Sequence, residues 1–178
     1  DTTPMAAAAI DLAAAGYTER EFYAEGKASR YRGVLPGTVA TGQVIDGNWP
    51  YRTRVLVRAP KAEKFNGFLV VEWANVTAGQ DVDFAFAESY KYLLREGYAV
   101  AVVSAQRVGV DRLKTWNPER YGSLSVTADI TDPQGGGKID DCGFPINCPG
   151  DPLSWDIMTQ VSKALKDNLA ISHRSSAQ

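Results

Sequence analysis

Two short apolar segments, each ending abruptly in polar residues, constrain the fold of this chain most strongly. Residues 68–77 read FLVVEWANVT, and residues 99–110 read AVAVVSAQRVGV. Runs of this kind are typical of buried strands in parallel sheets. Between them, residues 84–97 have the apolar spacing of a helix, with Gly97 where a left-handed C-cap is expected. The pattern predicts a strand–helix–strand unit whose loops leave the carboxyl ends of the strands, where open α/β sheets place their sites.

Weaker patterns predict the other elements. Residues 28–34 open a strand, and arginine alternates with valine over 51–58, the period-two signature of a half-exposed strand. Residues 68–73 are apolar on both faces and are predicted to form a central strand. A helix is expected from Asp151 to Lys166, and residues 168–172 are able to begin a strand. On the predicted helix over 84–97, we expect Phe84, Ala87 and Leu94 to share the apolar face.

Length and composition indicate one domain. The 178 residues are 44% hydrophobic, which suffices for a single core spanning 1–178. Residues 125–149 are rich in glycine, proline and aspartate, and are predicted to be an excursion outside that core.

Several functional classes lack a signal. The 19 basic residues are dispersed among 21 acidic ones, so nothing favours nucleic acid. Apolar runs fall short of the ~18 residues that cross a bilayer. Neither a phosphate-binding glycine loop nor a dinucleotide fingerprint appears, and we therefore expect no cofactor.

The two cysteines bear on the compartment. Cys142 and Cys148 flank a short turn-forming segment that suits a local disulfide, worth ~2 kcal/mol in the chain-entropy model. Free thiols are the alternative. A metal site is disfavoured, because two thiols and the distant His173 do not complete a zinc ligand set. A disulfide implies an oxidising compartment, so we expect a secreted or periplasmic protein. Asp1 is not a translation start and is consistent with a removed signal peptide.

Four stretches together resemble the α/β-hydrolase superfamily, and within it the "alpha/beta hydrolase domain" family of bacterial esterase-like proteins. They are residues 65–77, 94–110, 118–124 and 150–160. The resemblance covers roughly residues 28–167. It implies an α/β fold with a mostly parallel sheet flanked by helices, and ester hydrolysis by a Ser-His-Asp/Glu triad.

The resemblance also implies an oxyanion hole. In that fold the loop after the third strand supplies one backbone N–H, and the corresponding residues here are 74–77. Asn75 and Val76 are the candidates. Such a donor contributes about 3 kcal/mol to lowering the barrier. The alternative is that Asn75 only stabilises a turn.

Other polar residues near the strand ends have structural alternatives. Gln106 and Arg107 either line a substrate cleft or, for Arg107, brace the loop at Asp111. Asp151 and Ser154 are expected to cap the following helix rather than act chemically. Glu72, inside a strand, must be paired or protonated if it is buried.

A nucleophile elbow is missing. The resemblance places it after the last helix, where the sequence is ISHRSSAQ, with neither the glycine nor a serine in the required position. We therefore do not assign Ser175 or Ser176 as catalytic, and we interpret His173 as an exposed tail residue.

Two hypotheses follow for the function. The first is an N-terminal portion of a secreted serine-type ester hydrolase, inactive as this chain alone, whose catalytic triad lies on a longer chain or a second polypeptide. The alternative is a non-catalytic structural module derived from a truncated hydrolase fold, which self-associates through an exposed sheet edge.

Overall fold

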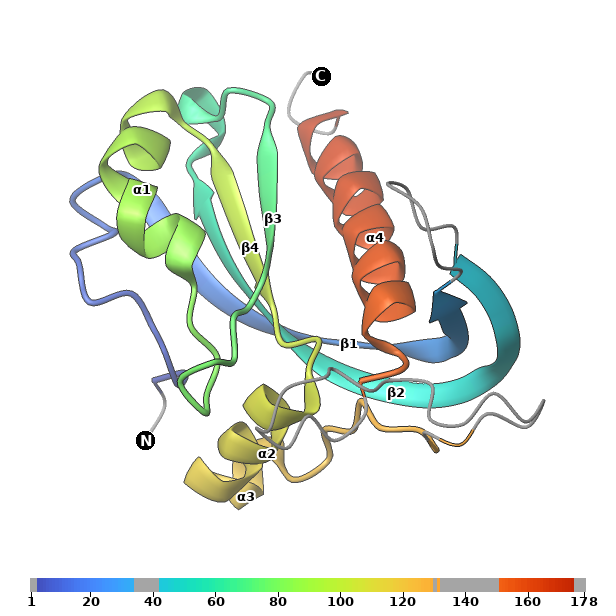
Figure 1. Ribbon diagram of the computed structural model, residues 1–178. Helices are drawn as coiled ribbons and strands as arrows, with labels where there is room; N and C mark the ends of the chain where they lie inside the picture. The colour runs from blue at the N-terminus through green and yellow to red at the C-terminus, as the bar shows by residue number, and fades with distance from the viewer. Residues whose placement is uncertain (1–2, 34–41, 130, 132–150, 175–178) are drawn as a thin grey trace.

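Four strands of the described residues form one sheet in the spatial order β1-β2-β4-β3. The computed structural model describes residues 3–33, 42–129, 131 and 151–174, of which 32–33 and 169–174 are described by their backbone alone. The strands are β1 (Tyr17–Gly33), β2 (Gly42–Pro60), β3 (Leu69–Trp73) and β4 (Ala99–Val103). Helices cover both faces of this sheet (Figure 1).

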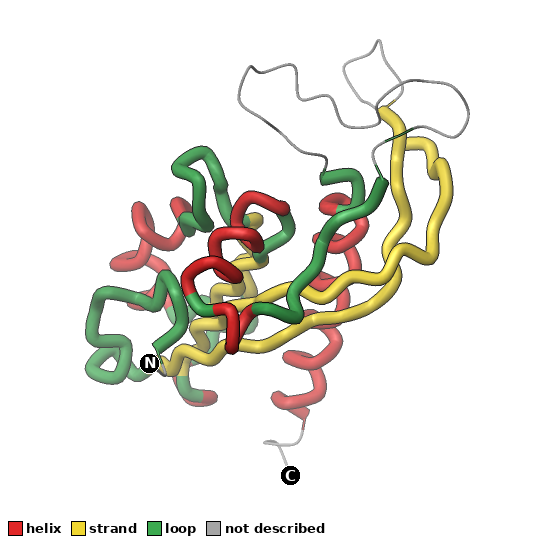
Figure 2. The backbone as a smooth tube through the Cα atoms, turned by 90° about the horizontal axis from the view of Figure 1, so that it is seen from below, coloured by secondary structure: helices red, strands yellow, loops and turns green. Residues whose placement is uncertain are grey.

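The α/β class is confirmed, but the prediction of a mostly parallel sheet is wrong. β1 pairs antiparallel with β2 from Tyr17 opposite Pro60 to Gly33 opposite Gly42, and β2 pairs antiparallel with β4. Among the described strands, β3 and β4 are the one parallel pair. A parallel pair needs a crossover connection, and α1 supplies one between β3 and β4. Figure 2 shows the long β1–β2 ribbon crossing the molecule and curving past α4 (Ser154–Arg174).

The central strand is also not the one predicted. All five residues of β4 are buried, whereas all five residues of β3 are only partly buried. Among the described strands, β3 lies at the edge of the sheet. The side chains of β3 are apolar on both faces because helices cover both faces of the sheet. This pattern does not require a neighbouring strand along each edge of β3.

Helix α1 (Phe84–Glu96) ends as predicted, and of the predicted apolar face Leu94 is buried whereas Phe84 and Ala87 are exposed. Gly97 adopts φ +77°, and a Cβ there would lie 2.1 Å from the carbonyl oxygen of Lys64, so only glycine fits. Phe84 is half exposed, and the buried positions are Phe86, Leu93 and Leu94. Phe86 turns inward because the guanidinium of Arg58 stacks on its ring, 4.0 Å from the centroid.

The remaining helices lie at either end of β3 and β4 or on the far face of the sheet, with η1 at the amino ends of the two strands and α2 and α3 at their carboxyl ends. They are the 3-10 turn η1 (Ala62–Lys64), α2 (Arg107–Trp116), α3 (Pro118–Tyr121) and α4. Helix α3 begins after Asn117, whose side chain accepts from the Arg120 N–H at 3.0 Å. We recognised no sequence pattern for α2. The strand considered at 168–172 is wrong, since α4 continues to Arg174.

Two apolar clusters lie on opposite faces of the sheet. On the face covered by α4, residues of α4 and the preceding Leu153 pack against β2 and β4. This cluster includes Val55, Val103, Leu153, Ile157 and Val161. On the other face, α1 and the N-terminal arm (residues 3–16) cover a cluster that includes Leu12, Tyr17, Leu56, Phe86 and Val102. Val126 is fully buried in the first cluster, so the excursion predicted from residue 125 does not leave the core there.

Candidate functional site

The carboxyl ends of β3 and β4 place three segments together. Because these two strands are parallel and adjacent, the loop after β3 (residues 74–83, the β3–α1 loop) and the turn after β4 leave from the same end of the sheet (Figure 1). The start of α4 reaches the same place, since the hydroxyl of Ser154 donates to the carbonyl of Ala105 at 2.7 Å. Open α/β sheets bind ligands at this end.

The candidate oxyanion donors occupy the first turn of the β3–α1 loop. The Asn75 N–H donates to the carbonyl of Val82 at 2.9 Å, and the Val82 N–H returns a bond of 2.8 Å. The Asn75 side chain accepts from the Thr77 N–H at 2.9 Å, the geometry of an Asx turn. The Val76 N–H, by contrast, has no hydrogen-bond partner among the described residues. Of the two candidates, only Val76 therefore offers a backbone donor that is not already used.

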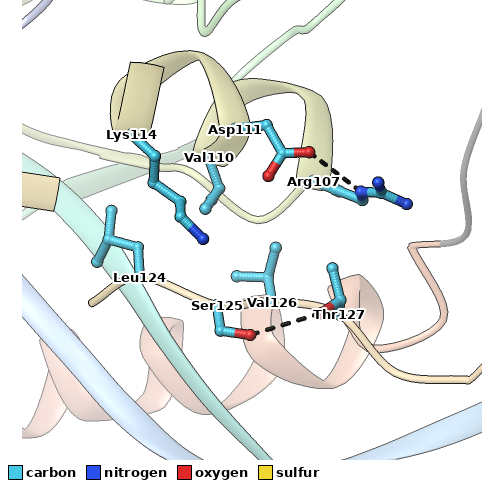
Figure 3. A pocket seen from close by; sticks show the side chains of 8 residues that line it. All are labelled: Arg107, Val110, Asp111, Lys114, Leu124, Ser125, Val126 and Thr127. Carbon is cyan, nitrogen blue, oxygen red and sulfur yellow. Dashed lines mark hydrogen bonds and ion pairs between the residues drawn. The ribbon is translucent and has the colours of Figure 1, made fainter. Parts of the chain in front are cut away.

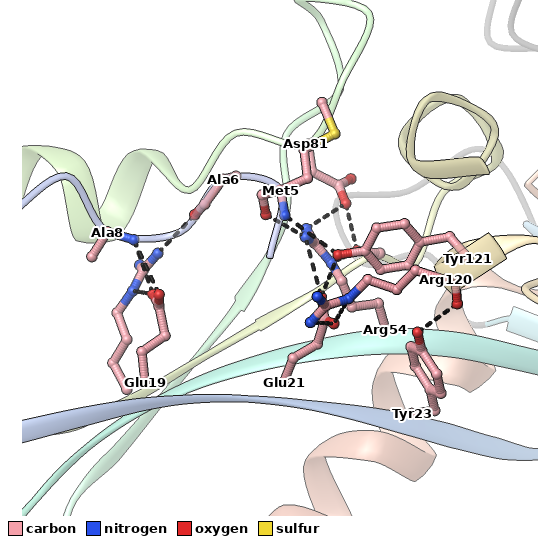
Figure 4. Close-up of polar contacts among 12 residues, drawn as sticks. Met5, Ala6, Ala8, Glu19, Glu21, Tyr23, Arg54, Asp81, Arg120 and Tyr121 are labelled. Atoms are coloured by element: carbon pink, nitrogen blue, oxygen red, sulfur yellow. Dashed lines mark hydrogen bonds and ion pairs between the residues drawn. The ribbon is translucent and has the colours of Figure 1, made fainter. Parts of the chain in front are cut away.

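A buried carboxylate fixes the far end of the same loop. Asp81 is 5% exposed, accepts from Arg54 Nη2 at 3.0 Å and also accepts from the Ser104 hydroxyl (Figure 4). Burial raises the pKa of Asp81, and Arg54 and the Ser104 hydroxyl offset part of that rise. Its second oxygen, Oδ1, packs against Gly109 of α2, where a Cβ would lie only 1.8 Å away.

A second carboxylate pair joins the loop to α1. Glu72 accepts from the N–H groups of Ala85 and Phe86 at 2.7 and 3.2 Å, which satisfies two free donors of the first helical turn. Burial raises the pKa of Glu72, and these two backbone donors oppose the rise. Asp83, at the end of the loop, pairs with the buried Arg58. The β3–α1 loop is thus held at its start, middle and end.

The two predicted cleft residues, Gln106 and Arg107, lie side by side and both donate to Asp151. Gln106 accepts from Trp73 Nε1 and donates to Asp151, each at 3.0 Å. The Arg107 N–H donates to the other Asp151 oxygen at 2.6 Å, and its exposed guanidinium pairs with Asp111 at 3.1 Å. Asp151 therefore ties the end of β4 to the approach of α4, and Ser154 does the same through its hydroxyl.

Sequence reasoning missed the buried arginines. Arg54 and Arg58 are each 1% exposed, so the prediction of a half-exposed strand over 51–58 is wrong. Arg54 also donates to the Met5 carbonyl and lies 3.9 Å from Glu21, and Arg58 pairs with Glu19 at 2.7 Å. Figure 4 shows these groups gathered beneath the N-terminal arm. The signal was available: Glu19 and Glu21 alternate on β1 with the same period as the arginines on β2.

The remaining predicted positions add little to the site. Cys142, Cys148, Ser175 and Ser176 lie outside the described residues, and His173 falls in the last turn of α4. Within the part of the chain that the structure describes, no group of three His, Cys, Asp or Glu residues is arranged to hold a metal ion. Among the described helices, none combines the length and apolar character needed to cross a bilayer.

Comparison with known proteins supports the resemblance noted in the sequence. The family model described as "Alpha/beta hydrolase domain" matches residues 1–175. No significant match was found among curated proteins or among solved structures. The match spans nearly the whole chain and includes the β3–α1 loop and both parallel strands. This chain belongs to the alpha/beta hydrolase domain family.

Proposed function

We propose that this chain carries the oxyanion-binding part of a serine-type ester hydrolase. The observation that supports the proposal is the Val76 N–H, which follows the carboxyl end of β3 and has no partner among the described residues. A donor of this kind accelerates acyl transfer only if it is fixed before the substrate binds. The Asn75–Val82 bridge and the Asp81–Arg54 pair provide that fixation.

In the proposed reaction, the ester carbonyl oxygen lies against the Val76 N–H. When a serine attacks the carbonyl carbon, the negative charge that develops on this oxygen is stabilised by the hydrogen bond. The nucleophile, acid and histidine belong to polypeptide outside this sequence, either a continuation or a second chain. We further propose that the protein is secreted or periplasmic, with a disulfide between Cys142 and Cys148.

Removal of one backbone N–H tests this proposal. In the native protein, purified with any polypeptide that accompanies it, Val76→Pro is expected to lower kcat on a short-chain ester by about 10²–10³-fold, because proline has no N–H. Val76→Ala keeps the N–H and is the matched control, with activity within about threefold of the native protein. Equal activity of the two variants, both folded by circular dichroism, would contradict the assignment. A native protein without esterase activity would contradict the enzymatic function altogether.

The second candidate function is a non-catalytic module that self-associates by strand addition. Its supporting observation is the position of β3, whose outer edge is unpaired among the described strands. Intact mass and sedimentation of the native protein distinguish the two. A 19.3 kDa chain that forms a stable dimer without esterase activity supports the module. A heavier chain or a bound second polypeptide supports the hydrolase, and a mass gain of two hydrogens on reduction supports the disulfide.

A further inference from the structure

A cavity of about 360 Å³ lies between α2 and the extended segment at residues 124–127 (the α2 cavity; Figure 3). Its inner wall is apolar and consists of Val110, Leu124 and Val126, all of which are buried. Two backbone hydrogen bonds between Ser125 and Arg52, of 2.8 and 2.9 Å, fix the outer segment against β2. The walls are therefore built from rigid elements and do not depend on an exposed loop tip.

The polar groups of the α2 cavity are mostly hydrogen-bond donors. Lys114 extends from α2 toward the opposite wall, where the hydroxyls of Ser125 and Thr127 lie 3.5 Å apart (Figure 3). Lys114 forms no ion pair or hydrogen bond with any residue that the structure describes. Arg107 and Asp111 also line the cavity, but they neutralise each other in a pair of 3.1 Å. One positive charge is thus left without a counter-charge.

We propose that the α2 cavity binds the carboxylate of a small organic anion. The lone ammonium matches a single negative charge, and the two hydroxyls supply additional donors to the carboxylate oxygens. Inorganic phosphate fits less well, because its two charges at neutral pH would meet only one uncompensated cation.

Succinate titration followed by amide NMR tests the binding site without requiring catalysis. Shifts should concentrate at Lys114 and residues 124–127. Lys114→Met should weaken binding about tenfold or more, and Thr127→Val should weaken it by a smaller factor. Lys91→Met, an exposed lysine of α1, is the matched control and should bind as the native protein does. Unchanged binding in Lys114→Met, equal binding of neutral succinamide, or tighter binding of phosphate would overturn the proposal.

Discussion

The two faces of the sheet are built from different chemistry although they share the same strands. On the α4 face, β2 and β4 present residues such as Val55 and Val103, against which Ile157 packs. On the arm face, Leu56 of β2 lies between Arg54 and Arg58, whose guanidiniums are buried under the N-terminal arm. The α4 face is held by apolar contacts, whereas the arm face combines an apolar cluster with buried charged groups that have fixed partners.

The difference shows which face controls the candidate site. Apolar contacts are non-directional and tolerate a change of shape at a graded cost. Removing either partner of a buried ion pair strongly destabilises the fold, because the other charge is left without solvent or counter-charge. Among the described residues, the ion pairs of the β3–α1 loop are made with the arm face, by Asp81 to Arg54 and by Asp83 to Arg58. The geometry at Val76 therefore depends on the less tolerant half of the molecule.

The largest expected effect comes from removing Arg54. Arg54→Met leaves Asp81 buried without its cation, whereas Glu21 keeps its pair with Arg120. The free energy of unfolding should fall by about 3–5 kcal/mol in urea titrations at pH 7. Arg54→Lys should recover only part of this loss, because an ammonium cannot reproduce the guanidinium geometry toward Ser104, Asp81 and Met5.

Arg52 provides the matched control on the same strand. Its side chain is 40% exposed and lies 3.7 Å from the exposed Glu25, so Arg52→Met should cost no more than about 1 kcal/mol. Equal losses for Arg52→Met and Arg54→Met would mean that the arm face does not depend on its buried pairs, and the contrast between the faces would be lost.

An intermediate effect is expected from Tyr17, which lies on the arm face. Its hydroxyl donates to the carbonyls of Leu93 and Tyr98, and burial raises its pKa to about 12. The unfolded chain loses this proton near pH 10, while the folded protein keeps it to about pH 12. The folded state therefore binds more protons across that window, and stability must fall as the pH rises. The loss should reach about 2–3 kcal/mol by pH 12 and be absent below pH 10.

Comparison with Tyr17→Phe isolates this contribution. Urea titrations of both proteins at pH 9, 10, 11 and 12 should show the native protein losing its advantage over the variant as the pH rises. Tyr31→Phe, on the outer part of β1, serves as the control for removing a tyrosine elsewhere. A difference between the native protein and Tyr17→Phe that is constant with pH would rule out the linkage.

The smallest expected effect is on the α4 face. Ile157 is fully buried, and Ile157→Val removes one methylene, which should lower the free energy of unfolding by about 0.5–1.5 kcal/mol. Thermal unfolding measures this difference. A loss as large as that of Arg54→Lys would show that the α4 face is no more tolerant than the arm face.

Local patterns predicted the parallel unit correctly. The strand–helix–strand arrangement and the left-handed cap at Gly97 follow from periodicity and from the conformational freedom of glycine, both of which are properties of short segments. The position of the Val76 loop follows from them, because the chain must leave β3 where its apolar run ends. The family resemblance added the chemical interpretation.

Reasoning from local patterns was wrong or silent where the structure depends on pairing between segments that are distant in the sequence. Alternation over 51–58 is equally consistent with arginines in solvent and with arginines paired to carboxylates on a neighbouring strand. Only the register of β1 against β2, with Glu19 opposite Arg58, distinguishes the two cases. The Lys114 site depends on the approach of α2 to residues 124–127, which no local pattern encodes.

Gly109 gives α2 a mutational profile unlike that of an ordinary surface helix. It has no side chain and takes part in no proposed chemistry, yet Asp81 Oδ1 occupies the space where its first carbon branch would be. Even alanine there would push the carboxylate away from Arg54 and shift the loop that leads back to Val76. In a saturation library, position 109 should therefore tolerate substitution as poorly as the buried ion pairs, although its neighbours Arg107 and Asp111 accept most residues.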